Sequence, residues 1–525
     1  MTSLQRLTLA ATGLGLFMIF LDALIVNVGL PAIQEDFRVG EAGMQWVVAG
    51  YSLGMAVFIM SSATLADLFG RRRAYLAGIA VFTLASIACG LAPSIIALDV
   101  ARGLQGAAAA TVNVTSLALV SAAFPEPATK ARAIGLWAAI AGVANAIGPT
   151  LGGFLIEAIG WRSIFWVNVP VGVVVVLLTV RHVEESRDER SRSFDAVGQA
   201  LFMVAVGAFA YAVIEGPHEG WTSAPILGFF AVAIAALVAF IRYEMRAPDP
   251  MMDLTLFRDR VYALAIATIC VALFTFYGML LLTTQYLQNV RGFTPVDTGL
   301  FLLPFAIAML VASPLAGRMV GKHGTAVPIR IGLSIMMIAL VVLIAGTARH
   351  PLLVTSGLAM AGFGYALCLT PITTLAMTSV APARAGMASG IMSAQRAIGS
   401  TLGFAVMGSI LSAWLGATLD ADLAPVIADP RERAVVSQAI IAGANPRAQV
   451  AEVAPAWPIR HPDAQVYAAI LDVAQRDFVT GIRVALGVAI ALLAAVFAAG
   501  LAWLPRAPGA ALAEAQREAA KERDP

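Results

Sequence analysis

Apolar stretches of membrane-spanning length dominate this chain of 525 residues. We count fourteen of them, each roughly 20 residues or longer, which is the length that a helix needs to cross a bilayer core of ~30 Å. Charged residues make up only 13% of the chain, about half their share of a typical soluble domain. The stretches are too long and continuous for the strands of a membrane barrel. The sequence therefore predicts an all-α polytopic membrane protein with fourteen transmembrane helices.

The fourteen stretches fall into three groups along the chain. We expect six helices in residues 1–193, two in residues 194–250 and six in residues 251–508. They begin near Leu7, Met44, Ala74, Ser94, Ala131, Trp161, Phe194, Ala224, Val261, Val296, Val327, Leu352, Gly386 and Val479. Residues 419–478 contain no apolar run of membrane length, so we expect an external loop that is partly helical and rests on the membrane surface. The charged, Ala-rich residues 509–525 are expected to form a cytoplasmic tail.

The basic residues set the expected orientation, because cytoplasmic loops of membrane proteins carry an excess of Lys and Arg. If the N-terminus is cytoplasmic, the cytoplasmic segments hold 22 of the 34 basic residues. The short external loops then hold only Arg38, Arg162, Arg291 and Arg349. We therefore expect a protein of the cytoplasmic (inner) membrane with both termini in the cytoplasm.

Composition also argues against several classes of function. The formal net charge of +2 gives no reason to expect a nucleic-acid partner. The five histidines are scattered without ligand spacing, and the three cysteines lie inside apolar runs. Neither a metal site nor another cofactor is therefore expected.

An internal repeat relates the two groups of six stretches. Residues 146–153 read AIGPTLGG and residues 397–404 read AIGSTLGF, and an Ala-Arg-Ala step precedes each. A second echo relates Ala63, Asp67 and Gly70 to Gly317, Gly321 and Gly324. The offsets of 251 and 254 residues agree closely. They predict two six-helix bundles with two inserted central helices, and parallel six-helix repeats are typical of secondary transporters.

Eight segments together resemble a known family. They read LDALIVNVGLP (21–31), ADLFGRRR (66–73), LDVARGLQGAAAA (98–110), GLWAAIAGVANAIGPTLGG (135–153), WRSIFWVNVPVG (161–172), DLTLFRDR (253–260), TGLFLLP (298–304) and ASGIMSAQRAIGSTLG (388–403). In this order they resemble the major facilitator superfamily, in its fourteen-span branch of drug:proton antiporters. The resemblance covers nearly the whole chain. It implies a single-chain exporter in the lipid bilayer that rocks two bundles about a small-molecule substrate and is driven by protons.

Asp22 is an acidic residue deep inside the first stretch. A charge near mid-membrane costs roughly 2.5–3.5 kcal/mol on insertion scales, so such a residue usually faces the interior and has a function. Arg102 lies at similar depth: Asp22 is ~21 Å from the cytoplasmic side and Arg102 is ~12 Å below the external side of a core of ~30 Å. Asp99 precedes Arg102 by three positions and competes as its partner.

These three residues are the candidate proton-coupling site. The resemblance implies that Arg102 takes part in proton transfer. The alternative is that Asp22 only pairs with an arginine and never gains or loses a proton.

The turn after the second stretch holds Asp67, Gly70, Arg71 and Arg72. Gly70 permits a tight reversal, and Asp67 can lie against a helix N-terminus, where a negative charge is stabilised. The resemblance implies that this loop holds the two bundles together on the cytoplasmic side, although Ala63 stands where the family pattern has glycine. The alternative is that the arginines only set the orientation.

The fifth stretch carries a pattern of small residues: Gly135, Gly148, Pro149, Gly152 and Gly153. Glycines allow close helix approach, and proline permits a kink. The resemblance implies the motif associated with antiporters rather than importers, with Ala144 at a position that is usually glycine. Without the resemblance, the pattern predicts only tight packing.

Arg396 lies about ten residues into the thirteenth stretch and aligns with Asn145 in the repeat. An interior arginine at this depth indicates contact with substrate or with a carboxylate. The candidate substrate cavity consists of Asn145, Trp137, Phe276, Gln285, Gln288, Gln395 and Arg396. For the aromatic and amide members, core packing is an equal alternative.

The sequence thus predicts proton-coupled efflux of small amphipathic or cationic compounds, such as drugs and antibiotics. A dedicated exporter of an endogenous lipid, peptide or antibiotic is the first alternative. A membrane enzyme such as an acyltransferase is a weaker one, because no His/Asp or Ser/His pair has catalytic spacing. Residues 321–323, Gly-Lys-His, lack the first glycine and the Ser/Thr of a phosphate-binding loop, which argues against an ATP-driven pump.

Overall fold

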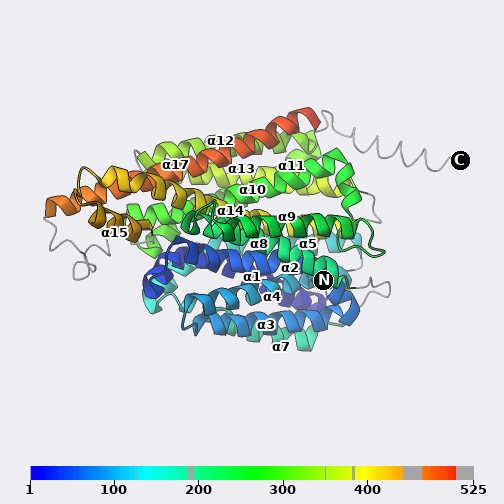
Figure 1. Cartoon of the computed structure of the whole chain (residues 1–525). Coiled ribbons are helices and arrows are strands. Elements are labelled where there is room, and N and C mark those ends of the chain that lie inside the picture. The colour runs from blue at the N-terminus through cyan, green and yellow to red at the C-terminus, as the bar shows by residue number, and fades with distance from the viewer. Residues whose placement is uncertain are drawn as a thin grey trace.

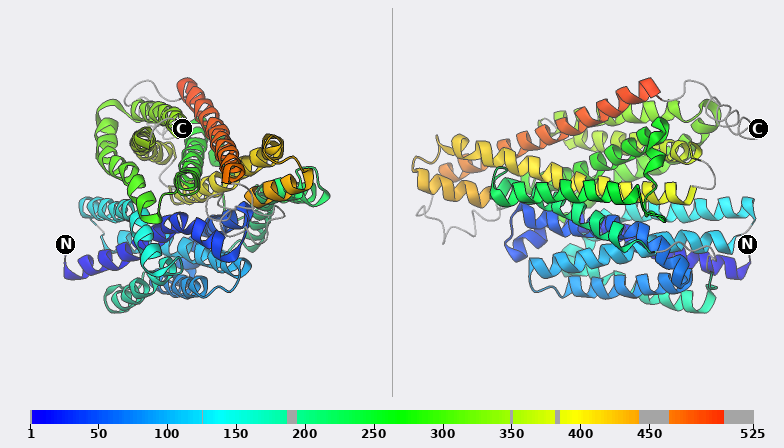
Figure 2. Two further views of the ribbon diagram at one scale, coloured as in Figure 1. Left: turned by 90° about the vertical axis from the view of Figure 1, so that its left-hand side faces the viewer. Right: turned by 45° about the vertical axis from the view of Figure 1, so that its right-hand side comes forward.

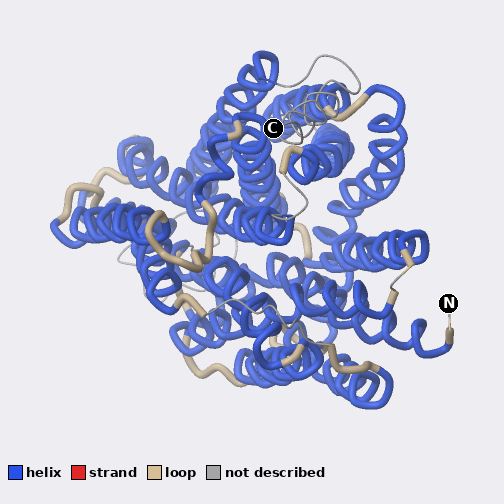
Figure 3. The backbone as a smooth tube through the Cα atoms, turned by 90° about the vertical axis from the view of Figure 1, so that its right-hand side faces the viewer, coloured by secondary structure: helices blue, strands red, loops and turns tan. Residues whose placement is uncertain are grey.

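The computed structural model describes residues 2–124, 126–186, 194–348, 351–380, 385–441 and 464–503. These residues are almost entirely helical and contain no strand, which confirms the expected all-α class (Figure 3). Within them, thirteen helices are long and apolar enough to cross a membrane. The fifth expected span corresponds to helix α5, in which only Ile147–Ile159 stands out as a shorter apolar segment. The count of fourteen therefore stays a prediction.

The helices follow the order in which the apolar stretches occur. The N-terminal set contains α1 (Ser3–Phe37), α2 (Glu41–Phe69), α3 (Arg71–Gly90), α4 (Ile95–Ala123), α5 (Pro127–Ile159), α6 (Ser163–Trp166) and α7 (Asn168–His182). The inserted pair is α8 (Ala196–Glu219) and α9 (Ala224–Glu244). The C-terminal set contains η1 (Leu254–Arg258), α10 (Arg260–Gln285), η2 (Tyr286–Val290), α11 (Pro295–His323), α12 (Ala326–Ala348), α13 (Pro351–Thr378), α14 (Ala385–Leu423), α15 (Pro430–Ile441) and α17 (Ala464–Trp503).

Side-chain caps fix several helix starts. Ser94 accepts a hydrogen bond from the backbone N–H of Ala97 at the start of α4, and Asp259 accepts from Val261 and Tyr262 at the start of α10. These caps satisfy N–H groups that have no partner within the helix. Short polar residues therefore separate the apolar stretches at the points where the chain reverses.

The two sets repeat one packing pattern. In the N-terminal set α1 packs on α5 and α7, α2 on α4, and α3 on α4 and α7. In the C-terminal set α10 packs on α14 and α17, α11 on α13, and α12 on α13 and α17. Figure 1 shows the first set, in blue and cyan, below the second, in green to red. The residue boundaries that we expect for the two bundles remain a proposal.

The two sets meet along α2 with α14 and along α5 with α11. Helix α8 contacts both α2 and α14, so the inserted pair lies against both sets. The start of α1 and the end of α17 lie at the same end of the molecule (Figure 2).

Several hydrogen bonds join the two sets at the opposite end, which is the expected external side. Gln288 Nε2 donates to the Val28 carbonyl oxygen over 3.1 Å. The backbone N–H of Val296 donates to Glu157 Oε1 over 3.2 Å. A Cβ added to Gly153 would overlap the backbone of Pro295, so α5 and α11 approach too closely for a larger residue. The structure is therefore closed at its expected external end.

The described part of residues 419–478 differs from a loop that rests on the membrane surface. Helices α14 and α17 contain 39 and 40 residues, or ~60 Å each at 1.5 Å per residue, which is twice the bilayer core. Their ends pack with α15 around a separate small core that includes Leu419, Val436 and Ile470. This unit projects beyond the other helices, at the left of Figure 1. Residues 442–463 and the expected tail 509–525 lie outside the described residues.

Candidate functional site

Asp22 and Arg102 form a buried ion pair in the interior of the N-terminal set. Both side chains are 0% exposed, and Arg102 Nη1 lies 2.5 Å from Asp22 Oδ2. Arg102 Nε also donates to the Val47 carbonyl oxygen of α2 over 3.1 Å, and the guanidinium lies over the ring of Tyr51 at 4.4 Å. The contact that the depth argument predicts is therefore present.

Two amides complete the surroundings of Asp22. Gln105 Nε2 and Asn168 Nδ2 donate to Asp22 Oδ1 over 2.9 and 2.8 Å. Both amides also donate to Ser86 Oγ, over 3.2 and 3.0 Å. The carboxylate thus contacts residues from α4 and α7 and, through Ser86, is linked to α3.

The sequence reasoning missed Gln105, Asn168 and Ser86. Gln105 follows Arg102 by three positions, so it lies on the same face of α4, and this spacing could have identified it. Asn168 is a polar residue inside the apolar run after Trp161, which is a weaker signal. Nothing in the sequence around Ser86 distinguishes it from an ordinary helix serine.

Asp99 is not the partner of Arg102. Among the described residues its Oδ1 is buried without a hydrogen-bond partner, and no ion pair joins it to Arg102. One turn of α4 separates the two residues, but the guanidinium extends toward α1 and α2 instead. The competing pairing that the sequence left open is thus absent from this structure.

This site can couple protonation to helix packing. Removing one partner of a buried ion pair typically costs 3–5 kcal/mol, because the other charge is left uncompensated. Protonation of Asp22 would neutralise its charge while leaving Arg102 bonded to Val47 and Gln105. The contacts that hold α1 to α4 would therefore weaken, and those that hold α2 to α4 would remain.

The turn between α2 and α3 contains the predicted loop residues. Gly70 has φ of +103°, a conformation that L side chains rarely adopt. Asp67 pairs with the Arg71 side chain at 2.9 Å, so the expected position against a helix N-terminus is wrong for this residue. Glu185 takes that position instead and accepts the backbone N–H groups of Arg72 and Arg73 over 2.9 and 3.3 Å.

All these loop contacts stay within the N-terminal set. Arg72 Nη2 donates to the Val180 carbonyl oxygen over 2.7 Å, near the end of α7. That the loop holds the two sets together remains a prediction. The absence of such a contact in the described residues fits a molecule that is closed only at the expected external end.

The described residues of the fifth-helix pattern face two different neighbours. Gly148 and Gly152 lie against Leu24 and Ile25 of α1, whereas Gly153 lies against α11. Pro149 contributes its carbonyl to the contact with Gly299 of α11. The side of Gly135 lies outside the described residues. The role in antiport stays a prediction.

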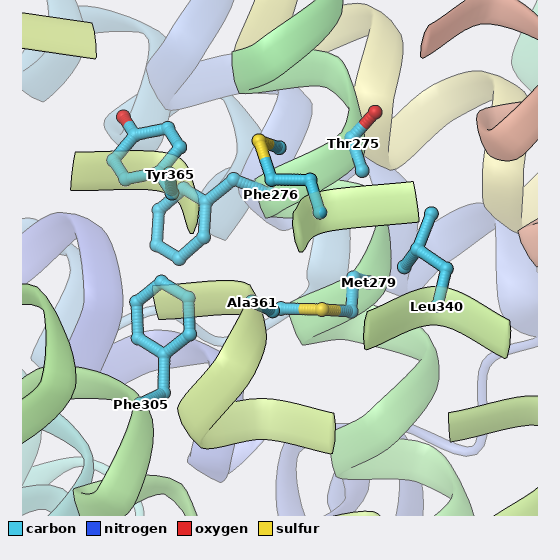
Figure 4. A pocket seen from close by; sticks show the side chains of 8 residues that line it. Thr275, Phe276, Met279, Phe305, Leu340, Ala361 and Tyr365 are labelled. Atoms are coloured by element: carbon cyan, nitrogen blue, oxygen red, sulfur yellow. The ribbon is translucent and has the colours of Figure 1, made fainter. Parts of the chain in front are cut away.

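Phe276 and Arg396 lie in one aromatic region of the C-terminal set. Phe276 contacts Tyr277, Phe305 and Tyr365 at ring separations of 4.7, 5.0 and 5.1 Å. Figure 4 shows Phe276, Phe305, Tyr365 and Met279 around a small apolar cavity. Arg396 Nη2 donates to Thr373 Oγ1 of α13 over 3.0 Å.

The other proposed cavity residues are not gathered at this place. Gln288 joins α10 to α1, and Trp137 packs against apolar clusters of the N-terminal set. Gln285 is buried and Gln395 is half-buried on α14. The Asn145 side chain lies outside the described residues. Within the described part of the chain no group of three His, Cys, Asp or Glu residues could hold a metal ion.

Two helix sets with one packing pattern, and a buried ion pair inside the first set, define a membrane transporter. The sequence profile of the Major Facilitator Superfamily matches residues 12–404. The chain belongs to this superfamily.

Proteins with related sequences carry transport names. The chain is 61% identical to the multidrug resistance protein Stp of Mycobacterium tuberculosis, over 96% of this chain and 93% of that protein. It is 44% identical to the drug efflux pump JefA of the same species, over 97% and 100%. It is 33% identical to the tetracenomycin C resistance and export protein of Streptomyces glaucescens, over 94% and 90%.

The fold also has solved counterparts. A bacterial homologue of the human lysosomal transporter Spinster, in an inward-facing and unoccupied conformation, superposes with a TM-score of 0.62 at 18% identity. The match covers 96% of this chain and 100% of that one. At this identity the likeness concerns the fold alone.

Proposed function

We propose that this chain exports small amphipathic compounds, among them drugs and antibiotics, across the cytoplasmic membrane in exchange for protons. Support for efflux comes from the relatives named for multidrug resistance, drug efflux and tetracenomycin C export, which align along 94–97% of the chain. We further propose that it works as a single chain with both termini in the cytoplasm. Membership of a transporter superfamily argues for transport rather than enzymatic catalysis.

The observation that carries proton coupling is the buried Asp22–Arg102 pair. Proton uptake by Asp22 converts an ion pair into a neutral carboxyl group beside a cation, and this weakens the attachment of α1 to α4. Release of the proton on the cytoplasmic side restores the pair. Exchange follows if substrate binding and proton binding favour different arrangements of the two sets.

A dedicated exporter of one endogenous antibiotic is the second candidate. It is favoured by the relative named for resistance to and export of a single compound, tetracenomycin C. A transport screen with unrelated compounds separates the two, since a dedicated exporter accepts one chemical class.

The test of proton coupling is transport in proteoliposomes with an imposed pH gradient. Ethidium and pyrenebutyrate serve as cationic and anionic fluorescent probes. Asp22→Asn keeps the size of the side chain and one acceptor oxygen but cannot release a proton, so uphill export should be lost. Exchange of substrate down its own gradient should persist.

Asp36→Asn is the matched control, because Asp36 lies on the same helix and pairs with Arg162 on the surface at 2.8 Å. It should export normally. Uphill export at the parent rate by the Asp22→Asn variant, at equal protein level, would remove Asp22 from the coupling mechanism.

A further inference from the structure

Arg396 is a cation inside the membrane-spanning part of the C-terminal set. It lies 11 positions after the first residue of α14, which places it ~17 Å along the helix. Its half-buried side chain makes one hydrogen bond, from Nη2 to Thr373 Oγ1. Its Nε is buried and has no acceptor among the described residues.

The C-terminal set offers this cation no carboxylate. Between Arg260 and Thr418 the sequence contains a single acidic residue, Asp297. Asp297 is exposed and lies in the first turn of α11, at the expected external end. The ionisable side chains that face Arg396 are Tyr277 and Tyr365, which are neutral at physiological pH.

Arg102 shows how this chain treats an arginine that has a protein counter-ion. Its guanidinium contacts the Asp22 carboxylate, the Gln105 amide oxygen and the Val47 carbonyl oxygen. Arg396 has one neutral hydroxyl in place of this set. Because an uncompensated charge inside a membrane protein is costly, it usually marks a place where a charged ligand binds.

The surroundings of Arg396 describe the rest of such a ligand. Tyr277 and Tyr365 belong to the aromatic region that also contains Phe276, Phe305 and Phe404. Tyr365 lines the apolar cavity of Figure 4 as well as facing the guanidinium. A flat apolar ring therefore has aromatic partners next to the position where a negative group would meet Arg396.

We propose that Arg396 binds a negatively charged group of the cargo, so that the transported compounds are amphipathic organic acids or zwitterions. The anion is a carboxylate, a sulfonate or an ionised phenol attached to an aromatic or apolar ring system. The planar guanidinium fork matches such oxygens with two parallel N–H donors. This inference rests on the proposed efflux function and replaces its expectation of cationic cargo.

The test compares three probes that share one ring system and differ only in charge. They are pyrenebutyrate, pyrenebutanol and pyrenebutylammonium, and their binding to the purified full-length protein is measured by pyrene fluorescence anisotropy. The parent should bind the anion at least tenfold more tightly than the alcohol, which corresponds to about 1.4 kcal/mol, and bind the ammonium most weakly. Arg396→Gln should remove the preference for the anion and leave binding of the alcohol within about twofold. Arg396→Lys should keep part of the preference, because the charge remains while the fork is lost.

Arg483→Gln is the matched control. Arg483 lies on α17 and donates from Nε to the hydroxyl of Thr347 over 3.2 Å, away from the aromatic region. This variant should bind all three probes as the parent does. An equilibrium binding measurement needs no pH gradient, so a failure of proton coupling would not affect it.

Two results would overturn the proposal. One is a parent protein that binds pyrenebutylammonium as tightly as pyrenebutyrate. The other is an Arg396→Gln variant that remains monodisperse and keeps the parent's preference for the anion. A variant that loses only substrate-induced proton release, with unchanged binding of all probes, would instead assign Arg396 a carboxylate of the protein as its partner in another conformation.

Discussion

Asp22 accepts hydrogen bonds from donors that differ in charge and in the helix that supplies them. Arg102 contributes a charge-assisted bond, whereas Gln105 and Asn168 contribute neutral amide bonds. Charge-assisted bonds are roughly twice as strong as neutral ones. Arg102 is therefore the group that most favours the ionised form of Asp22, and the amides orient the carboxylate.

The first prediction at this scale concerns the pH dependence of export. Arg102→Ala removes the cation, so Asp22 retains its proton to higher pH and the pH profile of export shifts upward. Arg102→Lys should shift it less, because the charge remains and only the fork is lost. Asp99→Asn should leave the profile unchanged, since Asp99 is not bonded to Arg102. Substrate-induced proton release measured against pH distinguishes the three variants, and an Arg102→Ala profile that overlays the parent's would refute the coupling of the pair.

A second residue-scale prediction concerns Glu185, which the sequence reasoning did not single out. Its carboxylate accepts two backbone N–H groups at the start of α3. Loss of such a cap costs about 1 kcal/mol, so Glu185→Ala should lower the thermal unfolding temperature of the detergent-solubilised protein. Glu184→Ala, at the exposed neighbouring position, should not. Equal unfolding temperatures for the two variants would exclude the cap.

The sequence could predict the Asp22–Arg102 contact because helical depth follows directly from residue count. It could not predict Ser86 or Asn168, since their positions depend on how α3 and α7 rotate about their own axes. The same limit explains why Gln288 and Trp137 were wrongly placed in one cavity. Their depth was predictable, but the faces that they present were not.

At the scale of helices, the contact between α5 and α11 controls the expected external end. Gly153 and Gly299 lie opposite backbone atoms of the facing helix, near Pro295 and Pro149. Gly142 lies on the same helix α5 with open space where a Cβ would be added. The two glycines of α5 are chemically identical, so their different surroundings allow a controlled comparison.

Gly153→Ala should shift the protein away from the externally closed state, because an added methyl group in a full interface typically costs 1–3 kcal/mol. Gly142→Ala should have no such effect. A Thr298→Cys reporter measures the shift, since Thr298 is 0% exposed beside Gly299. Its reaction with a membrane-impermeant maleimide should accelerate in the Gly153→Ala background only. Unchanged labelling there would mean that this contact does not set the balance of states.

At the scale of the whole molecule, the sequence echo between residues 146–153 and 397–404 corresponds to equivalent places. The first segment lies on α5, which packs on α11, and the second lies on α14, which packs on α2. Both therefore lie on helices that join the two sets. The repeat could be predicted because small residues are needed where helices of the two sets approach. Which end is closed could not be predicted, since one sequence must serve both the open and the closed arrangement.

Alternating access predicts that fixing the two sets together at the closed end stops transport. Glu157→Cys with Val296→Cys places a thiol on each side of the α5–α11 contact, where Glu157 now accepts the Val296 N–H. Oxidation should abolish export and leave substrate binding intact, and a reducing agent should restore export. Asp36→Cys with Arg162→Cys is the control pair, because these residues form a 2.8 Å ion pair at the same end but within the N-terminal set. Its crosslink should leave export unchanged, since residues of one rigid set do not separate during rocking. Both pairs are introduced after replacement of Cys89, Cys270 and Cys368, so that only the new thiols react. Continued export by the fully crosslinked Glu157/Val296 variant would exclude rocking of α5 against α11 from the transport cycle.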